Sequence, residues 1–261
     1  MDITSQRLFR SRTMRSMLCG VLMLTGLLPA GVTMPSCLAQ TCTPTATFSY
    51  TNEDGDAVED EPAENYSGQA PVKAVFSANP SNHEGFEARY EWTIYDQDDE
   101  QKALVHRFEE NLEYTFNHSG TFYVELKATF TRGGEVVSYP EEGVEGSRFT
   151  VSIEKSQLEM PNGFSPNEDG WNDVYCAKKT HRSIVEFHAT IFNRWGQKLY
   201  SWDDVNGSWN GKVNGRVIKD GVYFVNVVAK GADGRVYHIR KDVNVMTRKP
   251  GEEGTTSGGQ P

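Results

Sequence analysis

Short apolar segments with a period of two, separated by turn residues, are the feature that most restricts the fold of this chain. In Tyr123–Ala128, Val124 and Leu126 alternate with more polar side chains, the spacing of an antiparallel strand with one buried face. The chain holds 13 Phe, 11 Tyr and 5 Trp and lacks the long Ala, Leu, Glu and Lys stretches typical of helices. We therefore predict an all-β protein. The strands expected in the first half are Phe48–Thr51, Val72–Ala78, Tyr90–Tyr95, Leu104–Phe108, Glu113–Phe116, Thr121–Thr131 and Arg148–Ile153.

The spacing of these strands predicts two domains after a leader segment. Seven short strands within about 110 residues, separated by turn clusters such as Asn79–Asn82, are typical of an immunoglobulin-like sandwich. We assign this sandwich to residues 40–157. Residues 158–248 form a second group of strands, and residues 249–261 contain mostly Gly, Ser, Thr and Pro, which predicts a flexible tail. The predicted architecture is two small antiparallel β-sandwiches in tandem.

The second group of strands has its own alternation and turn signals. Four apolar residues at every second position, from Val185 to Ile191, predict a strand with one buried face. Asp233-Gly234 is a hairpin signal between two long strand candidates, Val222–Ala229 and Arg235–Met246. Trp195 and Trp209 are expected to fill the core or its edge.

The first 39 residues have the pattern of a secretory signal. Four arginines precede the apolar run Met17–Leu28, and a small-residue cleavage site follows at Ala39. No later stretch reaches the roughly 20 apolar residues of a membrane-spanning helix, so we expect an exported chain without such an anchor. Lipidation of Cys37 is the less favoured alternative. Cys42 and Cys176 are expected to be unpaired, although an oxidising compartment would allow a disulfide.

Charge differs sharply between the two predicted domains. Residues 40–157 contain 8 Lys and Arg against 23 Asp and Glu, whereas residues 158–248 contain 13 against 10. Nucleic acids and anionic membranes would be repelled by the acidic domain, so we predict neither as its partner. Within that domain, Asn52–Glu64 is dense in carboxylates. A solvated loop is the favoured interpretation and a cation site the alternative.

A second candidate cation site lies in the loop that opens the second domain. Asn167, Asp169, Asn172 and Asp173 surround Gly170, which is the kind of spacing that calcium loops use, with Asn167, Asp169 and Asp173 as the candidate ligands. The same residue types also build ordinary turns through local hydrogen bonds, and this needs no ion. We favour the turn and keep calcium as the alternative. No other cofactor is expected.

The sequence offers no pattern that predicts catalysis. It contains no H-E-x-x-H, no G-x-S-x-G and no glycine-rich phosphate loop, and its six His are scattered singly. Two small sandwiches also leave little room for a deep cleft. We therefore expect a protein that is not an enzyme.

Four motifs of the second domain resemble a known family. They are Pro161–Val174 (PNGFSPNEDGWNDV), Ile191–Gly196 (IFNRWG), Ser208–Gly211 (SWNG) and Asp220–Val225 (DGVYFV). Together they are similar to the type B, or gliding motility-associated, C-terminal sorting domain of type IX secretion substrates. The tail after Arg248 departs from the family, whose members usually end near the last strand.

The resemblance implies recognition by the outer-membrane translocon and its shuttle proteins. A protein of this kind is exported through the periplasm and is finally located at the cell surface, on the outer membrane or in the medium. The residues expected to carry recognition are Asn167, Asp169, Gly170, Asn172, Asp173, Asn193, Arg194, Trp195, Gly196, Asp220 and Gly221.

The first domain is similar to PKD domains. Tyr90-Glu91-Trp92 and the later run Tyr114–Val124 resemble the aromatic strand and the corner of that family, whereas Asp96–Asp99 departs from its usual G-D-G turn. Trp92 is expected to be a core residue between two sheets. Similar modules engage proteins or glycans, which is the role the resemblance implies here.

Two functions are consistent with these observations. The favoured one is a non-catalytic exported envelope or surface protein whose PKD-like module binds a protein or glycan that the sequence does not name. The alternative is an accessory, signalling or regulatory component of the type IX system at the periplasm or outer membrane, which could engage an envelope sensor. The alternative rests on the relative size of the two domains, because the predicted sorting domain occupies about 90 residues and only one other small domain is predicted beside it.

Overall fold

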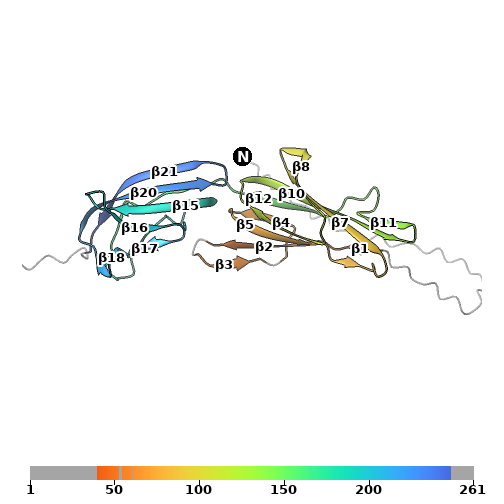
Figure 1. Ribbon diagram of the computed structural model, residues 1–261, viewed down its shortest axis with the longest axis horizontal. Coiled ribbons are helices and arrows are strands. Elements are labelled where there is room, and N and C mark those ends of the chain that lie inside the picture. The colour runs from red at the N-terminus through yellow and green to blue at the C-terminus, as the bar shows by residue number, and fades with distance from the viewer. Residues whose placement is uncertain (1–39, 53–54, 61, 248–261) are drawn as a thin grey trace, which may run out of the picture. The chain divides into compact units, whose positions relative to one another are not determined.

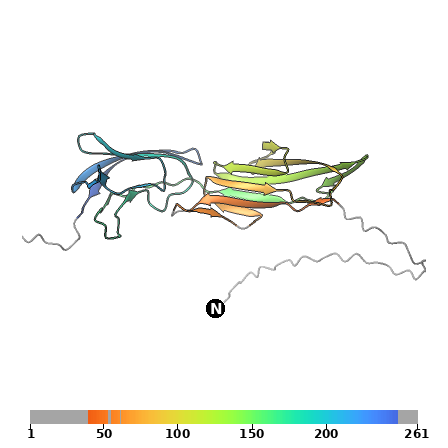
Figure 2. The same cartoon turned by 60° about the horizontal axis from the view of Figure 1, so that its bottom comes forward.

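The computed structural model describes residues 40–52, 55–60 and 62–247. The predicted signal segment, Cys37 and the tail 249–261 lie outside these residues. The described part of the chain consists of strands and turns without a helix, which confirms the predicted all-β fold. Consequently, none of its described elements is a helix long and apolar enough to cross a membrane. Figure 1 labels most of the strands, and Figure 2 shows them turned by 60°.

Two sheets form the first sandwich. The larger has the order β4-β12-β10-β7-β8, with β11 paired to β10, and the smaller has the order β3-β2-β5-β9. All pairs are antiparallel except β12 with β4. The strands of the larger sheet are β4 (Asn65–Gly68), β7 (Glu87–Asp96), β8 (Asp99–Arg107), β10 (Gly120–Arg132), β11 (Glu135–Tyr139) and β12 (Arg148–Ile153). Those of the smaller are β2 (Thr45–Thr51), β3 (Ala57–Glu59), β5 (Val72–Ser77) and β9 (Asn111–Phe116), and β1 (Thr41–Cys42) pairs separately with β6 (Pro80–Ser81).

Aromatic side chains from both sheets fill the first core. Trp92 is 0% exposed, and its indole N–H donates to the carbonyl oxygen of Glu110 at 3.2 Å. The ring of Phe76, on the smaller sheet, lies 5.8 Å from that of Trp92 and 5.4 Å from that of Phe149, both on the larger sheet. Val124 and Leu126 are buried, as their alternation predicts. Trp92 is therefore the core residue expected from the sequence.

A five-stranded sheet with the order β13-β21-β20-β15-β16 organises the second sandwich. The centre of this sheet is β20, which pairs with β15 on one side and with β21 on the other. The sheet consists of β13 (Gly163–Phe164), β15 (Ile184–Phe192), β16 (Lys198–Trp202), β20 (Gly221–Gly231) and β21 (Val236–Val245). Two short pairs complete the fold: β14 (Tyr175–Cys176) with β17 (Ser208–Trp209), and β18 (Lys212–Val213) with β19 (Arg216–Val217).

The second core contains Trp209 but not Trp195. Trp209 is buried, its ring lies 5.5 Å from that of Phe164, and its indole N–H donates to the carbonyl oxygen of Lys212. Trp195 is 76% exposed, so the expectation that it fills the core or its edge is wrong. The physical reason is its place in a tight turn between β15 and β16, beyond the last paired residues of the sheet.

Five strands between residues 40 and 157 were not expected. Two of them are β1 and β6, which pair with each other and of which β6 lies in the predicted turn cluster Asn79–Asn82; the other three are β3, inside the acidic stretch interpreted as a loop, β4 and β11. Strands β3 and β4 have only three and four residues, and the alternation of so short a segment cannot be separated from chance. Strand β11 pairs with the end of β10 across the turn at Gly133-Gly134, so its position depends on a long partner.

Both cysteines of the described chain are free thiols. Cys42 is buried, and this burial raises its pKa to about 11. Burial also raises the pKa of Cys176. Both thiols therefore stay protonated and weakly nucleophilic near neutral pH, in line with the expectation that they are unpaired.

A polar cluster fixes the hairpin between β20 and β21. Ser156 Oγ donates to Asp233 Oδ1 at 2.6 Å and lies 2.9 Å from the hydroxyl of Tyr237. A β-carbon on Gly231 would collide with Ser156 Oγ, so the close approach requires glycine there. The hydrogen bond from Ser156 is the largest cause that lowers the pKa of Asp233.

This pKa shift predicts a specific pH dependence of stability. A lowered carboxylate pKa stabilises the folded chain above the ordinary Asp pKa of about 3.9, and the gain is lost as the pH falls through the lower folded value. We expect Asp233→Asn, which does not titrate, to make the free energy of unfolding less steep in pH below about 4. Urea titrations at several pH values measure this slope, and an unchanged slope would contradict the role of Asp233.

Candidate functional site

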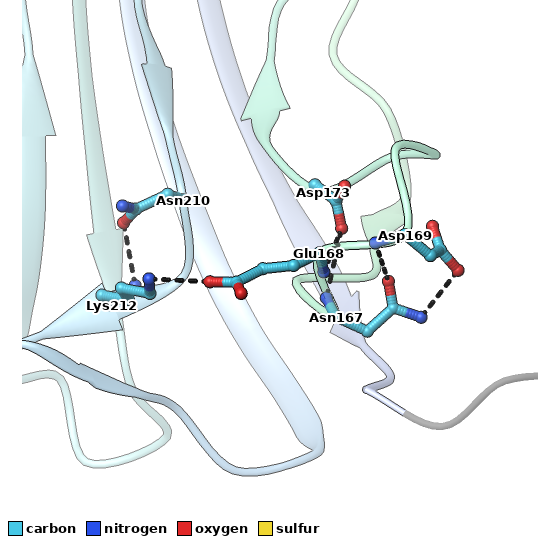
Figure 3. A network of polar contacts seen from close by, with 6 residues as sticks. All are labelled: Asn167, Glu168, Asp169, Asp173, Asn210 and Lys212. Carbon is cyan, nitrogen blue, oxygen red and sulfur yellow. Dashed lines mark hydrogen bonds and ion pairs between the residues drawn. The ribbon is translucent and has the colours of Figure 1, made fainter.

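The loop of residues 165–174, here named the Asn–Asp loop, is held together by the carboxylate of Asp173. Asp173 Oδ1 accepts hydrogen bonds from the backbone N–H of Asn167 at 3.2 Å and of Glu168 at 2.7 Å. Its Oδ2 accepts one from the backbone N–H of Gly170 at 2.7 Å. Figure 3 shows this carboxylate directed at the backbone of the loop. A single side chain thus fixes three peptide groups that would otherwise need water.

The other two candidate calcium ligands are also engaged inside the loop. Asn167 donates from Nδ2 to Asp169 Oδ2 at 2.9 Å and accepts from the Asp169 backbone N–H through Oδ1 at 3.2 Å. Asp169 Oδ1 accepts from the backbone N–H of Trp171 at 2.9 Å. In the described chain no group of three or more His, Cys, Asp and Glu is arranged to hold a metal. These contacts are local hydrogen bonds of the kind that Asn and Asp side chains make in turns.

An ion pair connects the Asn–Asp loop to the hairpin of β18 and β19. Glu168 Oε1 lies 3.0 Å from Lys212 Nζ, and Asn210 Oδ1 accepts from the backbone N–H of Lys212 (Figure 3). Asn214 and Gly215 at the tip of the hairpin have φ of 50° and 77°. These positive values at both central residues are those of a type I′ turn, the geometry that suits a two-residue hairpin.

A cavity of about 510 Å³ opens beside this hairpin. Its walls come from three separate segments of the sequence: the turn after β15, the strand β16 and the stretch from β18 into β20. Five of the residues expected to carry recognition line it: Asn193, Arg194, Trp195, Asp220 and Gly221. The remaining wall residues are Leu199, Val213, Arg216, Val217, Ile218, Lys219, Val222 and Tyr223.

The turn on one side of the cavity is built by Asn193. Its Oδ1 accepts from the backbone N–H of Trp195 and of Gln197, each at 3.0 Å, and Gly196 supplies the positive φ of 79° that the turn needs. The turn leaves Trp195 in solvent, where the guanidinium carbon of Arg194 lies 4.5 Å from the indole centroid. Asn193 and Gly196 therefore act through the backbone, and they position Arg194 and Trp195.

The opposite side of the cavity is fixed by Thr247, just after the end of β21. Asp220 Oδ1 accepts from Thr247 through its backbone N–H at 2.9 Å and its hydroxyl at 2.6 Å. Tyr223 donates from its hydroxyl to the carbonyl oxygen of Lys219 at 2.9 Å, and burial is the largest cause that raises its pKa. The hydroxyl of Tyr223 stays protonated near neutral pH, so the bond persists there.

The expected recognition residues thus occupy two neighbouring places. Five of them line the cavity and a sixth, Gly196, lies in the turn that forms one of its sides, so the motifs at Asn193 and Asp220 are brought together although they are far apart in the sequence. The five from Asn167 to Asp173 form the Asn–Asp loop, which contacts the hairpin at Lys212. The sequence reasoning missed Arg216, Lys219 and the apolar wall residues. Asn214-Gly215 is the sequence signal that could have identified some of them, because it predicts a two-residue hairpin turn and so places Val213 next to Arg216.

Comparison with known families decides what this second sandwich is. Residues 158–238 match the CHU_C Type IX secretion signal domain. The matched segment includes the Asn–Asp loop, every wall residue of the cavity and most of the five-stranded sheet. The chain thus carries a type IX secretion signal domain, which implies export to the cell surface or secretion.

Comparisons over longer parts of the chain carry no further argument. Dimeric latent PorU from Porphyromonas gingivalis is similar over 78% of this chain, with 11% identity and a TM-score of 0.23, and the chain spans 20% of the PorU chain. A tetra-tandem repeat in the extending region of a large adhesion protein is similar over 80% of this chain and 68% of its own, with 12% identity and a TM-score of 0.28. A search of curated proteins found no match.

The contacts of Asp173 predict a specific loss of stability. We expect Asp173→Ala to lower the free energy of unfolding by about 2 kcal/mol, because three backbone N–H groups lose a charged acceptor. Urea denaturation of the full chain measures this difference.

The matched control is Glu168→Gln, which removes only the exposed ion pair with Lys212 and is expected to change stability by less than about 0.5 kcal/mol. Added calcium or EDTA is expected to leave the midpoint of thermal unfolding of the wild-type chain unchanged. A clear rise with calcium would favour the alternative, an ion bound by Asn167, Asp169 and Asp173.

Proposed function

We propose that this protein is a non-catalytic envelope or surface protein whose first sandwich binds a protein or glycan after export. The observation that carries the proposal is the edge strand β8 of the larger sheet. It ends the strand order on its side, and nearly all of its residues are exposed. An open strand edge is a template for pairing with another polypeptide, so it supports a protein partner more directly than a glycan.

Side chains along β8 add both an apolar and an acidic character to this edge. Leu104 is 50% exposed and Phe108, just past the end of the strand, is 59% exposed, with the Arg89 guanidinium 5.2 Å from the ring. Asp98, Asp99 and other carboxylates surround the turn between β7 and β8. Exposed apolar side chains next to unpaired backbone groups are typical of contact surfaces, and the carboxylates favour a partner with basic groups.

Absence of catalysis is part of the proposal. His188 comes nearest to a catalytic arrangement, because its Nδ1 lies 2.5 Å from Asp203 Oδ1 and its Nε2 lies 3.1 Å from Thr190 Oγ1. However, Thr190 is only 6% exposed, so a substrate carbonyl has poor access to its hydroxyl. We interpret the three side chains as a chain of hydrogen bonds that orders β15 and the loop after β16.

Binding assays with the full chain test the proposed role of β8. We expect the double variant Leu104→Asp, Phe108→Ala to lose at least about tenfold in affinity for the partner found in a panel of matrix proteins and glycans, because it removes the apolar contacts of the edge.

Val144→Asp is the matched control, since Val144 is also exposed but lies on the loop between β11 and β12. It should bind like the wild type. If the panel yields no ligand, or if both variants bind equally well, the binding function of the first sandwich is wrong.

The second candidate function is an accessory or regulatory component of the secretion system that could engage an envelope sensor. It is favoured by the large share of the chain that the signal domain occupies. The matched signal domain spans residues 158–238, and the described remainder holds a single small sandwich. Deletion of the gene is then expected to change the amount of other type IX substrates in the medium, measured by quantitative mass spectrometry. Unchanged secretion of those substrates would eliminate this candidate.

A further inference from the structure

The cavity beside β18 and β19 has an apolar floor that belongs to the second core. Leu199, Val213, Ile218 and Tyr223 line the cavity and also pack against the buried cluster of the sandwich. These side chains are held in place by the core, so the floor is preformed. Its volume, about 510 Å³, lies in the range of sites that hold a few side chains or a small ligand.

Basic side chains without a counter-charge stand around this floor. Arg194, Arg216 and Lys219 line the cavity, and in the described part of the chain none of them forms an ion pair with a carboxylate. The carboxylate in the wall, Asp220, already accepts two hydrogen bonds from Thr247. The cavity therefore has an excess of positive charge that an incoming anion would neutralise.

Three exposed apolar side chains extend the floor outward: Trp195, Val217 and Val222. Trp and Arg are the residues most enriched where protein interfaces gain their binding energy, and here they lie side by side. A membrane surface fits the site less well, because residues 158–248 have only a small excess of basic over acidic residues and the site is hollow.

We propose that this cavity docks an acidic protein segment, which places an aromatic or aliphatic side chain on the apolar floor and carboxylates against Arg194, Arg216 and Lys219. The inference rests on the export role of the signal domain, since the partner is then a protein of the export route. The specificity for this partner then comes from the charge and the shape of the cavity. Asn193 and Gly196 are positioning residues, because they build the turn that carries Arg194 and Trp195.

Site-specific crosslinking in the bacterium that encodes the chain tests the proposal. The full chain carries p-benzoylphenylalanine at Val217, and the control carries it at Val236, which is also exposed but lies outside the cavity. After irradiation we expect an adduct at position 217 alone, to a peptide of another protein in which Asp or Glu flank an aromatic or aliphatic residue.

Charge reversal adds a second readout. Arg216→Glu with Lys219→Glu is expected to reduce both the adduct and the amount of exported chain at least about tenfold, because two attractive contacts become repulsive. Arg235→Glu with Arg240→Glu, two exposed arginines outside the cavity, should leave both unchanged. Equal thermal unfolding midpoints of the two variants exclude misfolding as the cause.

The outcomes separate this inference from the export role. If the wild-type chain is not exported, the export role fails. If it is exported but gives no adduct at position 217, or if the charge reversal has no effect, the cavity inference alone fails. An adduct to lipid, to residues 248–261 or to a second copy of the chain also contradicts it.

Discussion

The carboxylate of Asp173 fixes the end of the second sandwich on which the recognition motifs lie. By accepting three backbone N–H groups it sets the path of the Asn–Asp loop, and the loop presents Glu168 to Lys212 at the start of the β18–β19 hairpin. Val213 and Arg216 of that hairpin are walls of the cavity. The hydrogen bonds of Asp173 and the walls of the cavity are therefore linked by a series of short contacts, which runs from the Asn–Asp loop through the ion pair of Glu168 with Lys212 to the hairpin.

Much of the fold could be predicted from periodicity and turn chemistry. The long strands β7, β10, β15 and β20 have enough residues for alternation to identify their buried faces, and Trp92 is buried as expected. The Asn–Asp loop was recognisable because its side chains bond to backbone groups only a few residues away. Local interactions of this kind are encoded by spacing, whereas very short strands such as β3 are not.

The cavity could not be predicted because it is made by topology. Trp195 follows the end of β15 and Lys219 precedes the start of β20, and their proximity follows from the antiparallel pairing of these two strands, in which Phe192 faces Phe224. The exposure of Trp195 has a local cause, because the turn that Asn193 builds after β15 leaves this side chain in solvent. Sequence spacing alone says which residues share a face of one strand, not which strands become neighbours.

Amide hydrogen exchange, measured by NMR on the full chain, tests the central claim that Asp173 holds the Asn–Asp loop. The account predicts slow exchange for the amides of Asn167, Glu168 and Gly170, with protection lost together when Asp173 is replaced by Ala. Fast exchange of these three amides in the wild-type chain, at the rate of an open surface loop, would contradict it.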